Sequence, residues 1–358
     1  TTTQKKPHAP TAPDRVKEKP VMDKEPLDKS EVDRERRKIE ETKDERIISL
    51  LMPFELSSIN YKTAGFNQLA KAEIAIDFYQ GFKMALDSIA KHSDTNFKLQ
   101  VYDSKDDPAY VGMLAAKAGV KNSDLIVGPV FPNGMKAFTP YSIAMEKVVV
   151  SPLAATGPEA FNNPYLITLN NSIEQHAARA VGFIKQLRPK KVVLIRSGQQ
   201  EESKYAVPFK KEAAVVLKNT PVAEIGIKAV GLENVFKSLS PVGLNVVVLP
   251  STDRNFLLSI TNELEKLSRN FEISVVGHPS WENFEFLNSE KMQLLRTHIT
   301  SSYQVDFQDY RVNNFIENYR QKFHLEPGEY AFKGFDAGYF LGKLLSENGK
   351  DFALKLDN

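Results

Sequence analysis

Four short apolar runs along the chain end in small residues and prolines. They close at Val130, Pro152, Ser251 and Trp281, two in each half of the sequence. A β-branched run without polar alternation is typical of a strand that is buried on both faces of a parallel sheet. Pro and Gly then end each strand. Ligands of open α/β sheets bind beyond the carboxyl ends of the strands, so the pattern predicts two lobes with a cleft between them.

The alternation of strands and helices predicts two rounds of parallel α/β structure with right-handed crossovers. We expect a first lobe over 47–170 and a second over 171–308, with helices near 309–348 returning to the first. The predicted strands of the first lobe include 47–54, 97–102 and 165–169, and its long helix covers 69–92. Those of the second lobe include 191–196, 223–230 and 298–305, and its helices include 172–187, 208–217 and 254–267.

Residues 1–46 differ from the rest of the chain. They contain no aromatic residue, are rich in both charge signs, and carry five prolines before Leu27. Such a segment cannot bury enough apolar surface to offset the entropy of ordering it. We therefore expect a charged, partly disordered tether, with a solvated helix between Ser30 and Arg46 that Ser30 could cap.

Composition excludes several classes of function. The 358 residues carry a net charge of +2, so no surplus positive field indicates a nucleic-acid partner. Cysteine is absent, which excludes disulfides and thiolate chemistry. No apolar run approaches the roughly 18–20 residues of a membrane span. Phosphate-binding loops, nucleophile elbows and metal-spaced histidines are also missing, so we expect no enzyme, no cofactor and no metal.

Several ordered motifs resemble one protein superfamily, the type I periplasmic binding proteins that include the Leu/Ile/Val-binding group. They are 125–129 (LIVGP), 149–153 (VVSPL), 170–176 (NNSIEQH), 279–281 (PSW), Tyr303 with Asp306, 315–320 (FIENYR) and 331–336 (AFKGFD). The resemblance covers about 47–348. It implies a two-lobed α/β fold, each lobe a parallel sheet flanked by helices. It is closest to members associated with LysM peptidoglycan-binding repeats in Bacteroidetes.

The resemblance also implies a set of residues that contact a ligand in the cleft. Matching positions follow the strands of both lobes: Phe131, Ser151, Leu153 and Thr156 in the first, and Tyr205, Ser251, Ser280 and Trp281 in the second. For Trp281 and Phe131, a role in the core and a role as a ligand platform both remain open, because large aromatic side chains serve either. His278 ends a predicted strand, where a structural role competes with a functional one.

The chain departs from the amino-acid binders of this superfamily at one position. The resemblance leads us to expect Ser or Thr directly after the Gly-Pro pair. This chain has Val130-Phe131-Pro132 there. Proline has no N–H and phenylalanine offers no polar donor, so we expect free α-amino acids to bind weakly.

Two functions follow from these observations. The first is a non-enzymatic scaffold or regulator in the cell envelope, linked to peptidoglycan or to an envelope protein. The alternative is a solute receptor of an ABC-transport-like system that holds a small polar, amino-acid-like ligand in the cleft. The resemblance implies a periplasmic or envelope location, with a lipid anchor upstream of Thr1 as one arrangement.

Overall fold

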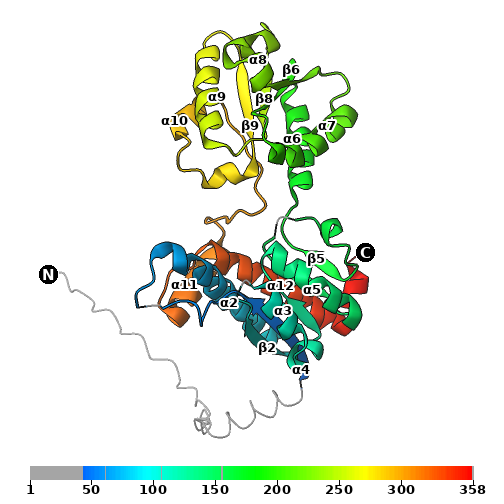
Figure 1. The fold of residues 1–358 in the computed structure, drawn as a ribbon. Helices are drawn as coiled ribbons and strands as arrows, with labels where there is room; N and C mark the ends of the chain where they lie inside the picture. Colours follow the sequence, from blue (N-terminus) through cyan, green and yellow to red (C-terminus); the bar gives the residue numbers. More distant parts are fainter. Residues whose placement is uncertain (1–42, 61, 106, 155, 357–358) are drawn as a thin grey trace, which may run out of the picture. The chain divides into compact units, whose positions relative to one another are not determined.

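The computed structural model describes residues 43–60, 62–105, 107–154 and 156–356. The predicted tether therefore lies almost wholly outside the described residues. From Asp44 onward the chain contains two parallel sheets, one in each lobe (Figure 1). No helix among the described residues has the length and apolar character needed to cross a membrane.

The first lobe is built on a five-stranded sheet in the order β2-β1-β3-β4-β5, all parallel. Its strands are β1 (Asp44–Met52), β2 (Thr95–Asp103), β3 (Leu125–Val127), β4 (Val149–Ser151) and β5 (Leu166–Thr168). β3 and β4 are buried at every residue, as their apolar sequences predict.

Helices cover both faces of this sheet. Helices α2 (Phe66–His92) and α12 (Glu329–Asn348) share one apolar cluster with the sheet, while α3 (Pro108–Ala115) and α5 (Pro132–Met145) pack in the cluster on the other face. The remaining elements are α4 (Ala118–Lys121), η1 (Pro158–Phe161), α11 (Tyr310–Phe323) and η5 (Gly349–Lys355). The C-terminal helices thus complete the first lobe, as a returning chain requires.

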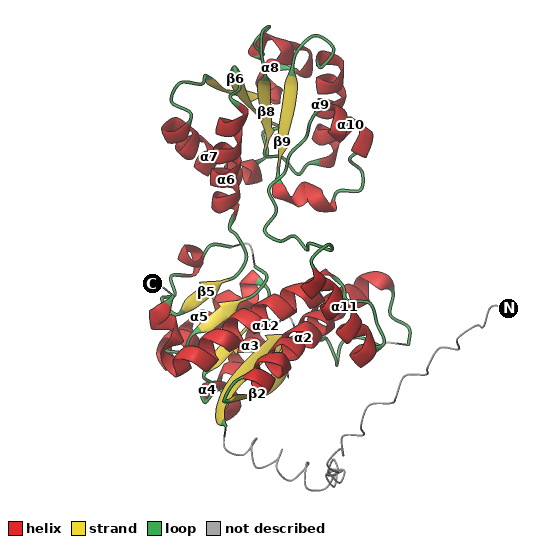
Figure 2. Cartoon of the chain, turned by 180° about the vertical axis from the view of Figure 1, so that it is seen from behind, coloured by secondary structure: helices red, strands yellow, loops and turns green. Residues whose placement is uncertain are grey.

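The second lobe has a four-stranded parallel sheet in the order β7-β6-β8-β9. Its strands are β6 (Lys191–Arg196), β7 (Val222–Gly226), β8 (Asn245–Leu249) and β9 (Ile273–Gly277). Helices α6 (Ile173–Leu187) and α7 (Ser203–Val216) lie on one face and α9 (Arg254–Leu267) on the other (Figure 2). Its shorter elements are α8 (Ile227–Val230), η2 (Gln200–Glu202), η3 (Leu232–Ser238), η4 (Pro279–Asn283) and α10 (Ser289–Leu294).

Two predicted strands differ from the structure. The strand expected at 223–230 ends at Gly226, where α8 begins. The strand expected at 298–305 is wrong: only His298 pairs with β9, through a single bridge to Val276. Beyond His298 the chain leaves the sheet and runs towards α11, and a backbone without a neighbouring strand cannot form a ladder.

Candidate functional site

The carboxyl edge of the first sheet carries a buried hydroxyl. Ser151 is the last residue of β4 and is fully buried. Among the described residues its Oγ has no hydrogen-bond partner. An unpaired buried hydroxyl costs free energy, about 1–3 kcal/mol, that a ligand or a water molecule can recover. Ser151 is therefore suited to donate a hydrogen bond to a group that enters from this edge.

The other predicted residues of the first lobe surround this edge. Leu153 and Phe131 are half-buried and pack against the first-lobe core, and Thr156 is half-buried in the loop after β4. The Leu153 carbonyl accepts a hydrogen bond of 3.0 Å from Nδ2 of Asn170, which fixes the loop. Leu153 also lines a cavity of about 190 Å³ together with Tyr303.

The second sheet has its own cavity at the carboxyl ends of β6, β8 and β9. It measures about 290 Å³. The side chains that line it are mostly polar: Gln199, Glu202, Ser251, Thr252, Asp253 and His278. Of the eight predicted ligand contacts, Ser251 lines this cavity, and His278 after β9 lines it as well. The position agrees with the general location of ligand sites in open α/β sheets.

Two carboxylates in this cavity already serve the backbone. Glu202 is buried and accepts hydrogen bonds from the N–H groups of Ser197 and Gly198, which closes the loop after β6. Asp253 caps α9 by accepting the Phe256 N–H at 2.7 Å. The charge of Glu202 is also paired with Arg196, whose Nε lies 3.6 Å from Oε2 of Glu202. Asp253 and Glu201 are therefore the lining carboxylates that favour a positive or hydrogen-bond-donating part of a ligand.

His278 is a neutral hydrogen-bond donor at this edge. Burial, with a smaller contribution from the charge of His176, lowers the pKa of His278 to about 4. Its Nδ1 accepts the Ser280 N–H at 3.1 Å, so the neutral ring carries its proton on Nε2. The sequence left both a structural and a functional role open for His278. Its Nδ1 has a structural role, because it caps η4, while its Nε2–H remains available as a donor.

Tyr205 provides a second buried hydroxyl, in α7. The residue is 1% exposed, and its OH has no hydrogen-bond partner among the described residues. Its ring centroid lies 5.8 Å from that of His278, which places it next to the cavity of the second lobe. Burial raises the pKa of Tyr205, so the phenol stays protonated and able to donate. Tyr205 and Ser151 are the only members of the predicted set whose buried polar atoms are unpaired within the described chain.

Trp281 and Ser280 do not present their side chains to the cavity of the second lobe. Trp281 is 5% exposed within the second-lobe core, and its ring packs against Gly277. Its Nε1 donates to the Ser251 carbonyl at 2.9 Å, which braces the loop after β8. The sequence leaves two roles open for Trp281, packing in the core or contacting a ligand, and its position in the structure fits packing in the core. Ser280 is exposed and contributes its N–H to His278.

The sequence did not indicate the role of His176. This residue lies in the first turn of α6, and its two ring nitrogens form hydrogen bonds with the hydroxyls of Thr300 and Ser302 at 2.7 and 2.8 Å. His176 therefore ties the first connection between the lobes to the second. Burial lowers the pKa of His176, while Glu282 opposes that shift. In the sequence, only its position in the 170–176 motif indicated that His176 could matter.

Sequence comparisons identify no relative: no family model matches the chain, and no curated protein matches it. Solved structures do match. A protein assigned as a branched-chain amino acid ABC transporter from Rhodospirillum rubrum has a TM-score of 0.64 and 14% identity, with 85% of each chain covered. An ABC transporter substrate-binding protein from Desulfitobacterium hafniense, in complex with Leu, has a TM-score of 0.57 and 16% identity over 87% of this chain and 88% of that one.

A third match is a solute-binding protein of an ABC transporter from Rhodopseudomonas palustris, in complex with 3,4-dihydroxybenzoic acid. It has a TM-score of 0.51 and 16% identity over 86% of this chain and 82% of that one. At these identities the matches show the fold alone. The chain has the two-lobed α/β fold of type I periplasmic binding proteins, as the motifs predicted.

The comparisons correct the first functional interpretation. The interpretation as a scaffold linked to peptidoglycan is wrong, because the solved structures reported above come from ABC transporter systems and include substrate-binding proteins. They favour the alternative, a solute receptor. The expected association with LysM repeats in Bacteroidetes finds no support in any comparison. The weak binding of free α-amino acids, expected from Phe131 and Pro132, stays a prediction.

Proposed function

We propose that this protein is a non-enzymatic solute receptor that closes on a small amino-acid-like ligand. The observation that supports the proposal is a pair of buried hydroxyls, Ser151 in the first lobe and Tyr205 in the second, each without a partner in the described chain. Each lies near the carboxyl ends of a parallel sheet, where ligands of this architecture bind. A bound ligand supplies the missing partners.

The chemistry of the two edges suggests how such a ligand is oriented. Ser151 offers a donor for a carboxylate, and half-buried Phe131 offers an apolar surface beside it. The cavity of the second lobe offers Asp253 and Glu201 for a positive or donating group. We infer a carboxylate with an apolar body, and Phe131 and Pro132 favour a ligand larger than a free amino acid. The proposed ligand contacts are Phe131, Ser151, Leu153, Thr156, Tyr205 and Ser251. Ser280 and Trp281 act indirectly, Ser280 by bonding His278 and Trp281 by bracing the Ser251 loop.

The proposed receptor function is consistent with the domain organisation and the cellular location that the sequence predicts. We infer a tether over 1–46 ahead of lobes at 47–170 and 171–308, with the first completed near 309–348. We also infer a place outside the cytoplasmic membrane, since the structural matches are substrate-binding proteins of ABC transporters. Fractionation of the cells that produce the protein tests the location, and recovery in the cytoplasm alone contradicts it.

Calorimetry with a panel of ligands tests the function. The panel contains the common amino acids, their N-acyl and dipeptide derivatives, and aromatic acids such as 3,4-dihydroxybenzoate. We expect at least one carboxylate to bind at micromolar concentration. Ser151→Ala should then weaken it roughly tenfold to hundredfold, the value of a lost hydrogen bond to a charged group of about 1.5–3 kcal/mol.

Matched controls separate a lost contact from a damaged fold. Ser259→Ala removes an exposed hydroxyl on α9, and Tyr310→Phe removes one from a side chain that is 72% exposed. Both should bind like the wild type, whereas Tyr205→Phe should bind more weakly. If no carboxylate in the panel binds, or if Ser151→Ala and Tyr205→Phe leave its affinity unchanged, the proposal fails.

A further inference from the structure

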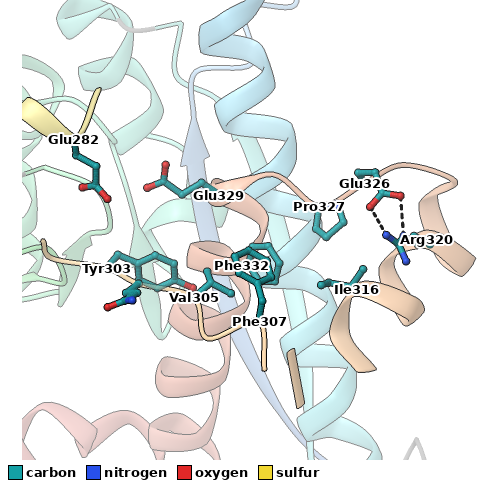
Figure 3. A pocket seen from close by; sticks show the side chains of 11 residues that line it. Glu282, Tyr303, Val305, Phe307, Ile316, Arg320, Glu326, Pro327, Glu329 and Phe332 are labelled. Atoms are coloured by element: carbon teal, nitrogen blue, oxygen red, sulfur yellow. Dashed lines mark hydrogen bonds and ion pairs between the residues drawn. The ribbon is translucent and has the colours of Figure 1, made fainter. Parts of the chain in front are cut away.

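A further cavity is lined by residues outside the predicted cleft set. Its volume is about 580 Å³, within the usual range of small-molecule sites of about 300–1,000 Å³. It is formed by the connection at 303–307, by α11 and α12, and by Glu282 of η4 (Figure 3). None of the eight residues predicted from sequence lines it, although Tyr303 lines both this cavity and the one beside Leu153.

Aromatic side chains make up much of the apolar lining of this cavity. Phe307 is 63% exposed, and its ring centroid lies 6.0 Å from that of buried Phe332 in an edge-to-face arrangement. Tyr303 lines the same cavity, and its OH donates to Oδ2 of Asp336 at 2.7 Å, which fixes the ring. An exposed phenylalanine beside two held rings offers a preformed surface for an apolar ligand.

Carboxylates surround these rings, and two of the three have cationic partners. Glu326 forms two hydrogen bonds with Arg320, at 2.7 and 2.8 Å, and Glu329 pairs with Lys333. Exposed Glu282 accepts a hydrogen bond from Ser301, and it has no cationic partner in the part of the chain that the structure describes. An ammonium group of a ligand would give Glu282 the kind of cationic partner that Glu326 and Glu329 already have.

The arrangement of these groups suits a single cation. Figure 3 shows the carboxyl groups of Glu282 and Glu329 extending from opposite sides towards the same space, on one side of the Tyr303 ring. The protein already places an ammonium group near this ring: Nζ of Lys333 lies 5.4 Å from the Tyr303 centroid. Cations are attracted to the faces of aromatic rings, and more strongly when a carboxylate is nearby.

We propose that this cavity binds a small organic monocation with an aromatic or apolar body, such as an arylalkylamine. Glu282 contacts the ammonium group, and Phe307, Phe332 and Tyr303 contact the body. The single positive charge of the ligand pairs with Glu282, as Arg320 pairs with Glu326 and Lys333 with Glu329. The site goes beyond the receptor function proposed above, because it shares no residue with the cleft set and takes a ligand of opposite charge.

Titration calorimetry or ligand-observed NMR with phenethylamine tests the proposal, and 3-phenylpropanoate serves as an anionic probe with the same ring. We expect the amine to bind the full chain and the acid not to bind this cavity. Glu282→Gln and Phe307→Ala should each weaken the amine about two- to fivefold, as expected for exposed ion pairs and cation–π contacts. Both side chains are exposed, so these variants should fold.

Control variants make each outcome decisive. Glu290→Gln on α10 and Phe236→Ala on η3 alter exposed residues elsewhere and should leave amine binding unchanged. Ser151→Ala should also leave it unchanged, whatever it does to carboxylate binding, so failure of one proposal is distinguishable from failure of the other. Absence of amine binding contradicts the proposal. So does equal sensitivity to the control variants, or loss of amine binding in Ser151→Ala.

Discussion

Gly81 of α2 packs directly against the main-chain carbonyl of Ala331 in α12. A Cβ at position 81 would overlap that oxygen, and it would also lie 2.8 Å from the backbone nitrogen of Phe335. Gly334 approaches the Phe78 backbone from the other helix in the same way. The two helices therefore touch through their backbones, and this contact attaches the returning C-terminal segment to the first lobe.

Gly81→Ala should destabilise the protein, because the obstacle is backbone that cannot rotate away. Overpacking of this kind costs about 1–3 kcal/mol. Gly182→Ala in α6 is the matched control: no atom lies within 4 Å of its Cβ, so the better helix propensity should stabilise by about 0.5–1 kcal/mol. Urea unfolding of both variants measures the difference. Equal stability of the two would contradict the close approach.

Tyr205→Phe should raise the free energy of unfolding of the ligand-free protein, by about 1 kcal/mol, because it removes a buried hydroxyl that has no partner. Tyr319→Phe should lower it by a similar amount, since the Tyr319 OH bonds Asp77 and Gln80. Chemical denaturation without ligand gives both values. If Tyr205→Phe destabilises as much as Tyr319→Phe, then the Tyr205 hydroxyl has a structural partner.

Stability should fall as the pH drops from about 6.5 towards 4. Burial lowers the pKa of His278 to about 4, against 6.5 for a free histidine, so the unfolded chain binds more protons in this window. The stabilisation is complete above pH 6.5 and is lost as the pH falls through the folded pKa. His176 and His298 shift in the same direction, so His278→Gln should reduce the pH dependence without abolishing it.

Unfolding measured at pH 7.5, 6.0 and 5.0 checks this expectation. Ser259→Ala on α9, which removes no titratable group, is the control and should keep the slope of the wild type. An unchanged slope in His278→Gln would show that its ring is accessible to protons in the folded state.

His176→Ala should loosen the link between the two connecting segments. Two hydrogen bonds are lost, and the hydroxyls of Thr300 and Ser302 lose their partner, at a cost of about 1–2 kcal/mol. Hydrogen exchange should accelerate at 299–303 and at the start of α6, and stay unchanged in the long helix α2. Uniform acceleration across both lobes would indicate general destabilisation instead.

Local patterns in the sequence were enough to predict most of the elements. The β-branched runs at 125–127 and 245–249 became fully buried strands, and Asp107 with Pro108 starts α3 as a cap and first-turn residue. Phe315 and Tyr319 lie one helical turn apart in α11, and both are buried. These features depend on neighbours within a few residues, which periodicity and turn chemistry report directly.

The tertiary structure decided which polar groups have partners. His176 bonds residues 124 and 126 positions away, and no spacing in the sequence indicates that pairing. The unpaired hydroxyls of Ser151 and Tyr205, and the use of Trp281 as a brace, also depend on contacts between distant segments. The failed strand at 298–305 has the same cause, since a strand exists only where another lies alongside. The sequence by itself therefore determined the alternating elements and their buried faces, while only the folded chain decided which side chains at the strand ends remain able to bind.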